Sequence, residues 1–156
     1  RADARQVVAK CREVGLTLTP TFVAFTPWTT LESYCDFLSE IDQLNLVDHV
    51  APIQLAIRLL VPEGSKLMEL DSFCSYLDPY DQKRLVYPWS HNDVRIDDLG
   101  KEIGELVTHN VMTSRREVFA MIWDLAHQRA GLRNHRRLSA TFGRTEVPYL
   151  NEPWYC

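Results

Sequence analysis

The sequence of 156 residues lacks most of the features that assign a chain to a class directly. No apolar run reaches about 18 residues, the length that a membrane-spanning helix needs. The first stretch, RADARQVVAKCREVG, carries charges where a secretory signal has an apolar segment. These absences predict a soluble, cytoplasmic protein that contacts no membrane.

Cysteine and histidine are sparse and scattered. The four cysteines are too far apart in the sequence for C-x-x-C zinc pairs or a dense disulfide scaffold: Cys11, Cys35, Cys74 and Cys156. The five histidines show neither an H-E-x-x-H motif nor a partner four residues away. We therefore expect reduced thiols and no metal site, with Cys11 and Cys35 on the apolar faces of helices.

Catalytic signatures are missing as well. The sequence has no G-x-S-x-G elbow and no recognisable Ser-His-Asp order, so catalytic residues are unknown. A hydrolase whose nucleophile and base come together only in the folded protein remains an alternative. The net charge of -4 gives no reason to expect nucleic acid. The charge is uneven, because five arginines and two acids lie from Arg129 onward. This tail is solvated, binds an anion or contacts another part of the protein.

The composition, with 46% hydrophobic and 24% charged residues, is typical of one globular domain with its own core. Apolar residues recur at helical spacing in four segments: one ending near Val14, one over 31–44, one over 96–107 and one from Ser114 to Gly131. The capping boxes Thr29-x-x-Glu32 and Ser114-x-x-Glu117 mark two of the starts. The last two helices should pack as a hairpin.

Two other segments favour strands. Residues 16–25 (LTLTPTFVAF) are rich in Thr, Phe and Val, and residues 51–60 (APIQLAIRLL) alternate between two faces. Because helix 31–44 lies between them, the order predicts a βαβ unit with parallel strands and a right-handed connection. Beyond residue 65 the sequence suggests short helical turns over 66–77 and an extended segment or short strand over 84–90.

Gln54 and Arg58 are polar residues inside the most apolar of these segments. They would point to one side of a strand together with Ala56, opposite an apolar set made of Ile53, Leu55, Ile57 and Leu59. Since the inner face of a (β/α) barrel can carry ligand-binding groups, both are interpreted as lumen residues. The alternative is an exposed edge, or polar groups satisfied by neighbouring carboxylates. Tryptophans such as Trp28 are more often core or interface residues than ligand-binding ones. Trp28 nevertheless follows the first strand, at the end where α/β proteins bind ligands, and is placed on this substrate side.

These expectations combine into an α/β fold: a partial (β/α) barrel fragment with a parallel βαβ unit, followed by a C-terminal helical hairpin and an extended tail. The expected divisions are the last βα units over 1–66, a helical appendage over 67–131 and an Arg-rich, aromatic tail over 132–156. A complete (β/α)₈ barrel needs about 250 residues. The expected partners are therefore the missing N-terminal half of the barrel, or a second copy paired through the exposed sheet edge.

The segments that carry these expectations resemble a known family. GLTLTPTFVAFTPWTTLESYCDFL followed by APIQLAIRLLVPEGSKL resembles the fifth and sixth βα units of the radical S-adenosylmethionine (radical SAM) enzymes, with turns over 25–30 and 62–65. The final YLNEPWYC resembles the segment before the terminus of a subgroup named for its Cys-Ala-Glu-Pro or Sec-Ala-Glu-Pro tail. The resemblance covers nearly the whole chain. It implies the C-terminal part of a radical SAM iron-sulfur oxidoreductase.

The resemblance also implies cofactors for the full-length protein, a [4Fe-4S] cluster on a Cys-x-x-x-Cys-x-x-Cys loop and S-adenosylmethionine. It places Phe25, Thr26 and Pro27 on the adenosine side, next to the three substrate-side residues named above. The sequence contains no such cysteine triplet, so this chain by itself should bind no cofactor and catalyse nothing. The alternative function is a non-catalytic α/β protein-interaction module whose Arg-rich tail docks an acidic partner.

Overall fold

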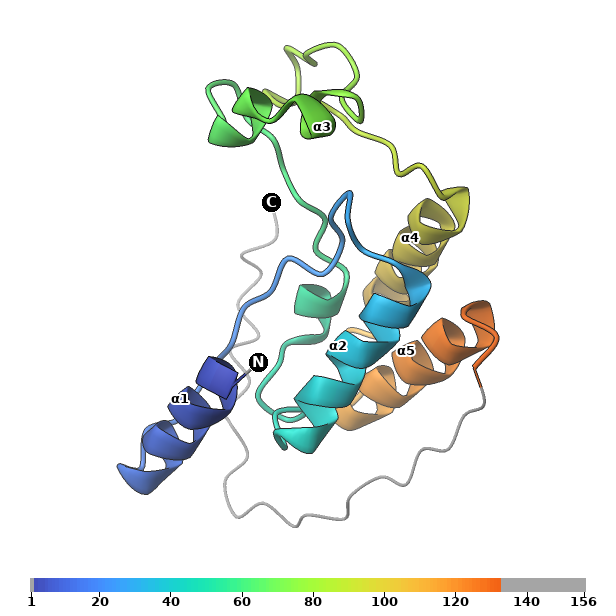
Figure 1. Cartoon of the computed structure of the whole chain (residues 1–156). Coiled ribbons are helices and arrows are strands. Elements are labelled where there is room, and N and C mark those ends of the chain that lie inside the picture. Colours follow the sequence, from blue (N-terminus) through green and yellow to red (C-terminus); the bar gives the residue numbers. More distant parts are fainter. Residues whose placement is uncertain (1, 133–156) are drawn as a thin grey trace.

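The computed structural model describes residues 2–132, and these form a helical protein (Figure 1). The elements in chain order are α1 (Ala2–Glu13), α2 (Leu31–Gln43), the 3-10 helices η1 (Pro52–Leu55) and η2 (Lys66–Glu69), α3 (Asp71–Cys74), α4 (Val94–His109) and α5 (Arg115–Arg129). The predicted Arg-rich and aromatic tail lies, apart from its first residue, outside the described part of the chain.

All four predicted long helices are present. α1 ends just before Gly15 and α5 just before Gly131, and these glycines have φ of 71° and 65°. A residue without Cβ takes this left-handed conformation at little cost, which is why the helices stop there. α5 begins at the predicted capping box, since the Ser114 hydroxyl accepts from the Glu117 amide and the Glu117 carboxylate accepts from the Ser114 amide.

The start of α2 differs from the prediction by one residue. The N-cap is Thr30, whose Oγ1 accepts from the Ser33 amide at 3.0 Å, while the Ser33 hydroxyl accepts from the Thr30 amide at 2.8 Å. The predicted box of Thr29 with Glu32 is therefore wrong. Thr29 is buried, and its hydroxyl oxygen instead accepts from the Thr26 amide at 3.0 Å, which closes the turn that precedes the helix.

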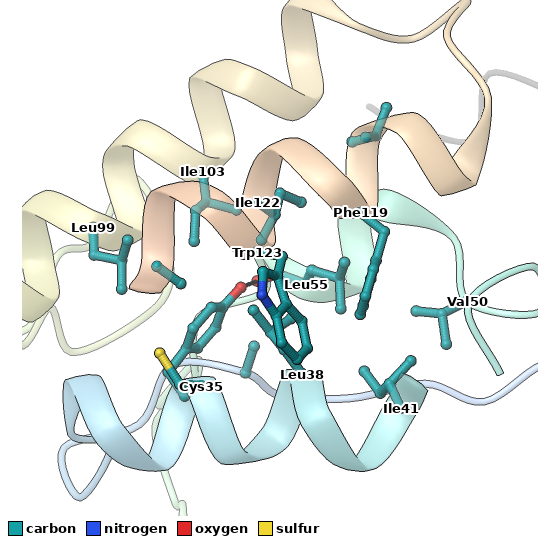
Figure 2. Packing of buried hydrophobic residues seen from close by; sticks show 14 of the residues in the cluster. Cys35, Leu38, Ile41, Val50, Leu55, Leu99, Ile103, Phe119, Ile122 and Trp123 are labelled. Atoms are coloured by element: carbon teal, nitrogen blue, oxygen red, sulfur yellow. Dashed lines mark hydrogen bonds between the residues drawn. The ribbon is translucent and has the colours of Figure 1, made fainter. Parts of the chain in front are cut away.

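The body of the protein is formed by α2, α4, α5 and η1, which pack with one another (Figure 1). α4 and α5 lie against each other as expected of a helical hairpin, and α2 packs on α5. Figure 2 shows how side chains from the three long helices and from η1 meet in one apolar core, among them Leu38, Leu55, Ile103, Phe119 and Ile122. This core contains residues from both sides of residue 66. The predicted domain boundary at residue 66 stays a prediction.

The predicted parallel βαβ unit and barrel fragment are wrong, because no sheet forms within residues 2–132. Residues 16–24 are extended without a strand partner. The segments expected to be strands meet at one isolated parallel bridge between Phe25 and Arg58. There the Phe25 amide donates to the Ile57 carbonyl at 3.0 Å, and the Leu59 amide donates to the Phe25 carbonyl at 2.8 Å.

The physical reason lies in the backbone groups of residues 51–56. A buried strand needs partners along both edges, and this part of the chain has no second strand to provide them. η1 satisfies the groups locally instead, since the Gln54 amide donates to the Ala51 carbonyl and the Ala56 amide to the Ile53 carbonyl, both at 2.9 Å. Pro52, which has no amide hydrogen, suits the first position of this turn.

Residues 59–90 form a second, smaller unit, which we call the lobe. Figure 1 shows it around α3, apart from the long helices. Val61, Phe73 and Trp89 are its buried residues, and further apolar side chains pack on them: Leu59, Leu67, Met68, Tyr76, Leu77 and Tyr87. The predicted short helical turns are η2 and α3, and the predicted extended segment forms isolated antiparallel bridges at Val86 and Trp89. In the described residues no helix has the length and apolar character needed to cross a membrane.

Candidate functional site

A polar cluster centred on Arg58 lies where the body and the lobe meet. Arg58 Nη1 donates to Asp97 Oδ1 of α4 at 2.7 Å, and Nη2 donates to the Trp89 carbonyl at 2.6 Å. The guanidinium carbon lies 3.5 Å from the centre of the Trp89 ring, a cation-π contact. The side chains of Arg58 and Asp97 are 35% and 27% exposed, so the ion pair is half-buried at the surface.

The bridge to Phe25 explains why Arg58 reaches α4. Residues paired in a bridge point to the same side, and the Phe25 ring lies against α4 at Gly100, where an added Cβ would be 3.5 Å from ring atoms. Arg58 therefore also faces α4. Asp97 precedes Gly100 by three residues, which places it on the same helix face, one turn nearer the N-terminus.

Short polar contacts fix the chain that carries Trp89 and Asp97. Asp97 Oδ2 accepts from the His91 amide at 3.0 Å, and His91 Nδ1 accepts from the Asp93 amide at 2.9 Å. Asp93 is the N-cap of α4, and its Oδ1 accepts from the Arg95 amide at 3.1 Å. The hydrogen bonds from the Arg95 side chain lower the pKa of Asp93 to about 2. The Asp93 and Asp97 carboxylates thus fix the backbone at the start of α4, and Asp97 also accepts from Arg58.

The predicted adenosine-side residues are engaged within the chain. The Phe25 ring is 1% exposed and stacks on Tyr34 at 4.9 Å between centroids, while both backbone groups of Phe25 are used in the bridge. The Thr26 hydroxyl lies 3.0 Å from the Thr29 hydroxyl, and Pro27 is buried. Their role towards adenosine stays a prediction, and Phe25 has no free group for it here.

Trp28 is the one residue of this turn with a largely open side chain. It is 52% exposed, and its ring lies 5.6 Å from that of Phe73 in the lobe. Because Phe73 and Trp89 belong to the same apolar cluster, the structure brings Trp28 and Arg58 to two sides of the lobe's attachment to the body. Two of the three predicted substrate-side residues therefore share one region.

Gln54 lies elsewhere. It is part of η1, and its Oε1 accepts from the Phe22 amide at 3.0 Å, which ties the extended segment to the body. The interpretation of Gln54 and Arg58 as barrel-lumen residues is wrong, because there is no sheet to form a lumen within residues 2–132. Arg58 instead matches the alternative drawn from the sequence, a polar group satisfied by a neighbouring carboxylate.

The described thiols do not fit an iron-sulfur cluster. Cys11, Cys35 and Cys74 lie on three different helices, and no group of three His, Cys, Asp or Glu residues within 2–132 could hold a metal ion. Burial raises the pKa of Cys35 to about 11, whereas a metal ligand has to be a thiolate. Cys156 lies outside the described residues.

No family model, no curated protein and no solved structure matches the chain. The interpretation of the site therefore depends on its own contacts.

Trp89, His91 and Asp97 complete the cluster, and sequence reasoning did not assign them to a site. The one available signal was that a guanidinium inside an apolar segment needs an acceptor. With 21 acidic residues in the chain, the sequence alone could not select Asp97.

Proposed function

We propose that this chain is the C-terminal part of a radical SAM oxidoreductase of the cytoplasm. In this proposal it supplies residues on the substrate side, while the cluster-binding loop and the remaining cofactor contacts come from the N-terminal part of the full-length protein. The substrate class is one that carries an anionic group, because Arg58 is the central side chain of the site.

The observation that carries the proposal is the parallel bridge between Phe25 and Arg58. It joins the two segments that resemble consecutive units of the family, with α2 as the connection between them. Because the bridge is parallel, the residues that follow Phe25 and those that follow Arg58 leave it in the same direction. The side chain of Trp28 and the loop that starts at Pro62 follow the two paired residues on this side of the bridge.

Arg58 and Trp28 have complementary chemistry for holding a substrate. The guanidinium has five N–H donors, and two of its nitrogens donate to Asp97 and to the Trp89 carbonyl. In this proposal the remaining N–H groups bind a carboxylate or phosphate. The Trp89 ring and Asp97 hold its plane in place, so little side-chain entropy would be lost on binding. The exposed Trp28 indole offers a flat apolar surface for another part of the substrate.

The test uses the full-length protein. The coding region that precedes Arg1 should encode a Cys-x-x-x-Cys-x-x-Cys loop, and the anaerobically reconstituted and reduced protein should form 5′-deoxyadenosine from S-adenosylmethionine. Absence of the loop, or reconstituted protein that forms no 5′-deoxyadenosine, would contradict the proposal.

The assigned residues are tested in the same assay with cell extract as the source of substrate. Arg58→Gln should lower extract-stimulated 5′-deoxyadenosine by about tenfold or more, because a charged hydrogen bond to the substrate is lost. Its cluster content should stay unchanged. Arg84→Gln is the matched control, since Arg84 is a 77% exposed lobe residue away from the cluster. Equal activities of the two variants would remove Arg58 from the site.

A protein-interaction module is the second candidate function, and exposed apolar side chains favour it. Leu16, Val23, Trp28 and Leu60 are between 51% and 71% exposed on the segments around the Phe25 bridge. The two candidates differ in what the isolated chain does. A module should be a stable monomer that binds its partner alone. A part of a larger enzyme should bind the N-terminal part of its own protein.

A further inference from the structure

Few apolar contacts connect the lobe to the body. The buried apolar residues fall into two clusters, one shared by α2, α4, α5 and η1 and one inside the lobe. Correspondingly, α3 packs on η2, while α5 packs on both α2 and α4. Figure 1 shows the chain crossing between the two units twice. We call the crossings on either side of the lobe, residues 57–58 and 91–93, the neck. With little apolar area shared, polar contacts at the neck set the orientation of the lobe.

Arg58 is the residue of the neck that contacts both units. It stacks on Trp89 of the lobe and donates to Asp97 of α4 in the body. One further hydrogen bond joins the neck to the body, because the His91 amide donates to Asp97 Oδ2 at 3.0 Å. Trp89 Nε1 donates to the Leu59 carbonyl at 2.7 Å inside the lobe, next to the neck. Loss of the guanidinium would leave the Asp97 carboxylate without its cation and the Trp89 ring without its cover.

The lobe has a hydrogen-bond network of its own that does not involve the neck cluster. The Tyr87 amide donates to the Val61 carbonyl at 2.8 Å, and the Asp78 amide donates to the Pro88 carbonyl at 2.8 Å. The Asp81 amide donates to the Val86 carbonyl at 2.9 Å. These bonds close the lobe on itself, so that it can change orientation without losing its internal contacts.

We propose that the lobe is a hinged unit and that Arg58 is the clamp that holds it against the body. Release of the clamp lets the lobe turn about the neck and separates Phe73 from Trp28, which opens the ring faces of both. The ion pair between Arg58 and Asp97 is partly exposed to solvent, so dissolved salt screens its charges and weakens the clamp. This inference goes beyond the proposed function and does not depend on it, since it concerns only contacts between described residues.

Amide hydrogen exchange measured by NMR on the 156-residue chain tests the hinge residue by residue. In Arg58→Gln the His91 amide should exchange roughly three- to tenfold faster than in the wild type. The Tyr87 and Asp78 amides inside the lobe should keep their rates. The control Arg129→Gln removes a similarly exposed ion pair, with Glu102, between two helices of the body, and should leave the rates of His91, Tyr87 and Asp78 unchanged.

The alternatives give distinct patterns. If Tyr87 and Asp78 also exchange faster, the lobe unfolds instead of turning, and if no rate changes, Arg58 is not a clamp. Arg58→Lys keeps the charge near Asp97 without the planar contact to Trp89, and it should give intermediate rates if the glutamine variant fails to fold. Raising NaCl from about 0.05 to 1 M should accelerate exchange at His91 in the wild type but not in Arg58→Gln. A neck insensitive to salt would also overturn the proposal.

Discussion

At the scale of single residues, Tyr34 shows how one polar group can organise an apolar core. Its ring is buried against Phe25, and its hydroxyl donates to the Leu55 carbonyl at 2.8 Å. That bond satisfies a carbonyl at the end of η1, where no helix or strand neighbour is available. The tyrosine thus fixes the distance between α2 and the segment that leads to Arg58.

Tyr34→Phe should lower the free energy of unfolding by about 1–2 kcal/mol, because the Leu55 carbonyl stays buried without its donor. Urea denaturation followed by circular dichroism measures the change. Tyr80→Phe is the control, since Tyr80 packs on Tyr87 and its hydroxyl makes no hydrogen bond to other residues of the described range. An equally small loss of unfolding free energy in both variants would show that the Tyr34 hydroxyl does not stabilise the protein.

The same hydroxyl predicts a pH dependence. Burial raises the pKa of Tyr34 far above its ordinary value of about 10. The folded state therefore keeps a proton that the unfolded state releases, so the contribution of Tyr34 is complete below about pH 10 and is lost as the pH rises above it. The stability difference between the wild type and Tyr34→Phe should shrink between about pH 9 and 11. A difference that is constant with pH would contradict this assignment.

Asp93 gives a second titration with the opposite sign. Hydrogen bonds from the Arg95 side chain lower its pKa to about 2, so the pairing stabilises the folded state above the ordinary carboxyl pKa and is lost as the pH falls through about 2. In Arg95→Gln the pKa of Asp93 should rise towards its ordinary value. Carboxyl carbon NMR shifts measured against pH follow it directly. A pKa that stays near 2 would mean that Arg95 is not the cause.

At the scale of elements, the start of α2 shows how local hydrogen bonds choose between neighbouring residues. Thr29 and Thr30 are both good N-caps, but the Thr29 hydroxyl is taken up inside the turn by Thr26 and by the Ala24 carbonyl. Only Thr30 is then free to cap the helix. This turn also directs Trp28 outwards to the lobe, so the choice of cap influences the candidate site.

Thr30→Ala should therefore destabilise the protein by about 1 kcal/mol, because the Ser33 amide loses its acceptor in the first turn. Glu32→Gln, which alters the residue expected in the other capping box, should change stability by less than about 0.5 kcal/mol. Thermal denaturation of the two variants compares them directly. A larger loss of stability in Glu32→Gln than in Thr30→Ala would indicate that Thr29 and Glu32 form the capping box.

At the scale of the whole molecule, the two separate apolar clusters predict two levels of stability. Ile122 and Phe73 are both fully buried, one in the body and one in the lobe. Ile122→Ala should cost about 2–5 kcal/mol and lower the urea midpoint of the helical signal. Phe73→Ala should open the lobe while leaving that midpoint nearly unchanged, because α2, α4 and α5 do not depend on it.

Two probes separate these outcomes: far-ultraviolet circular dichroism reports the long helices, and hydrogen exchange at Tyr87 reports the lobe. Coincident loss of both signals in Phe73→Ala would show that body and lobe unfold together, and that the neck couples them more strongly than its contacts indicate.

The long helices could be predicted from the sequence, because their signals are local. Helical spacing, the Ser114 capping box and glycines at 15 and 131 act within a few residues, and α1, α2, α4 and α5 follow them. The strands were predicted from equally clear patterns, but those predictions were wrong. A strand is stable only when a second backbone segment completes its hydrogen bonds. With one bridge at Phe25, residues 51–56 closed into η1 instead.

For the candidate site, the sequence could single out Arg58 as a charge in an apolar segment, and Trp28 as an aromatic residue after a buried one. The residues that surround these two side chains depend on the tertiary packing. Asp97 and Trp89 follow Arg58 by 39 and 31 positions, and which acid pairs with the guanidinium depends on how α4 packs across the Phe25 bridge. That packing is a balance of many weak contacts distributed along the chain, whereas caps and helical periods depend on a few neighbouring residues.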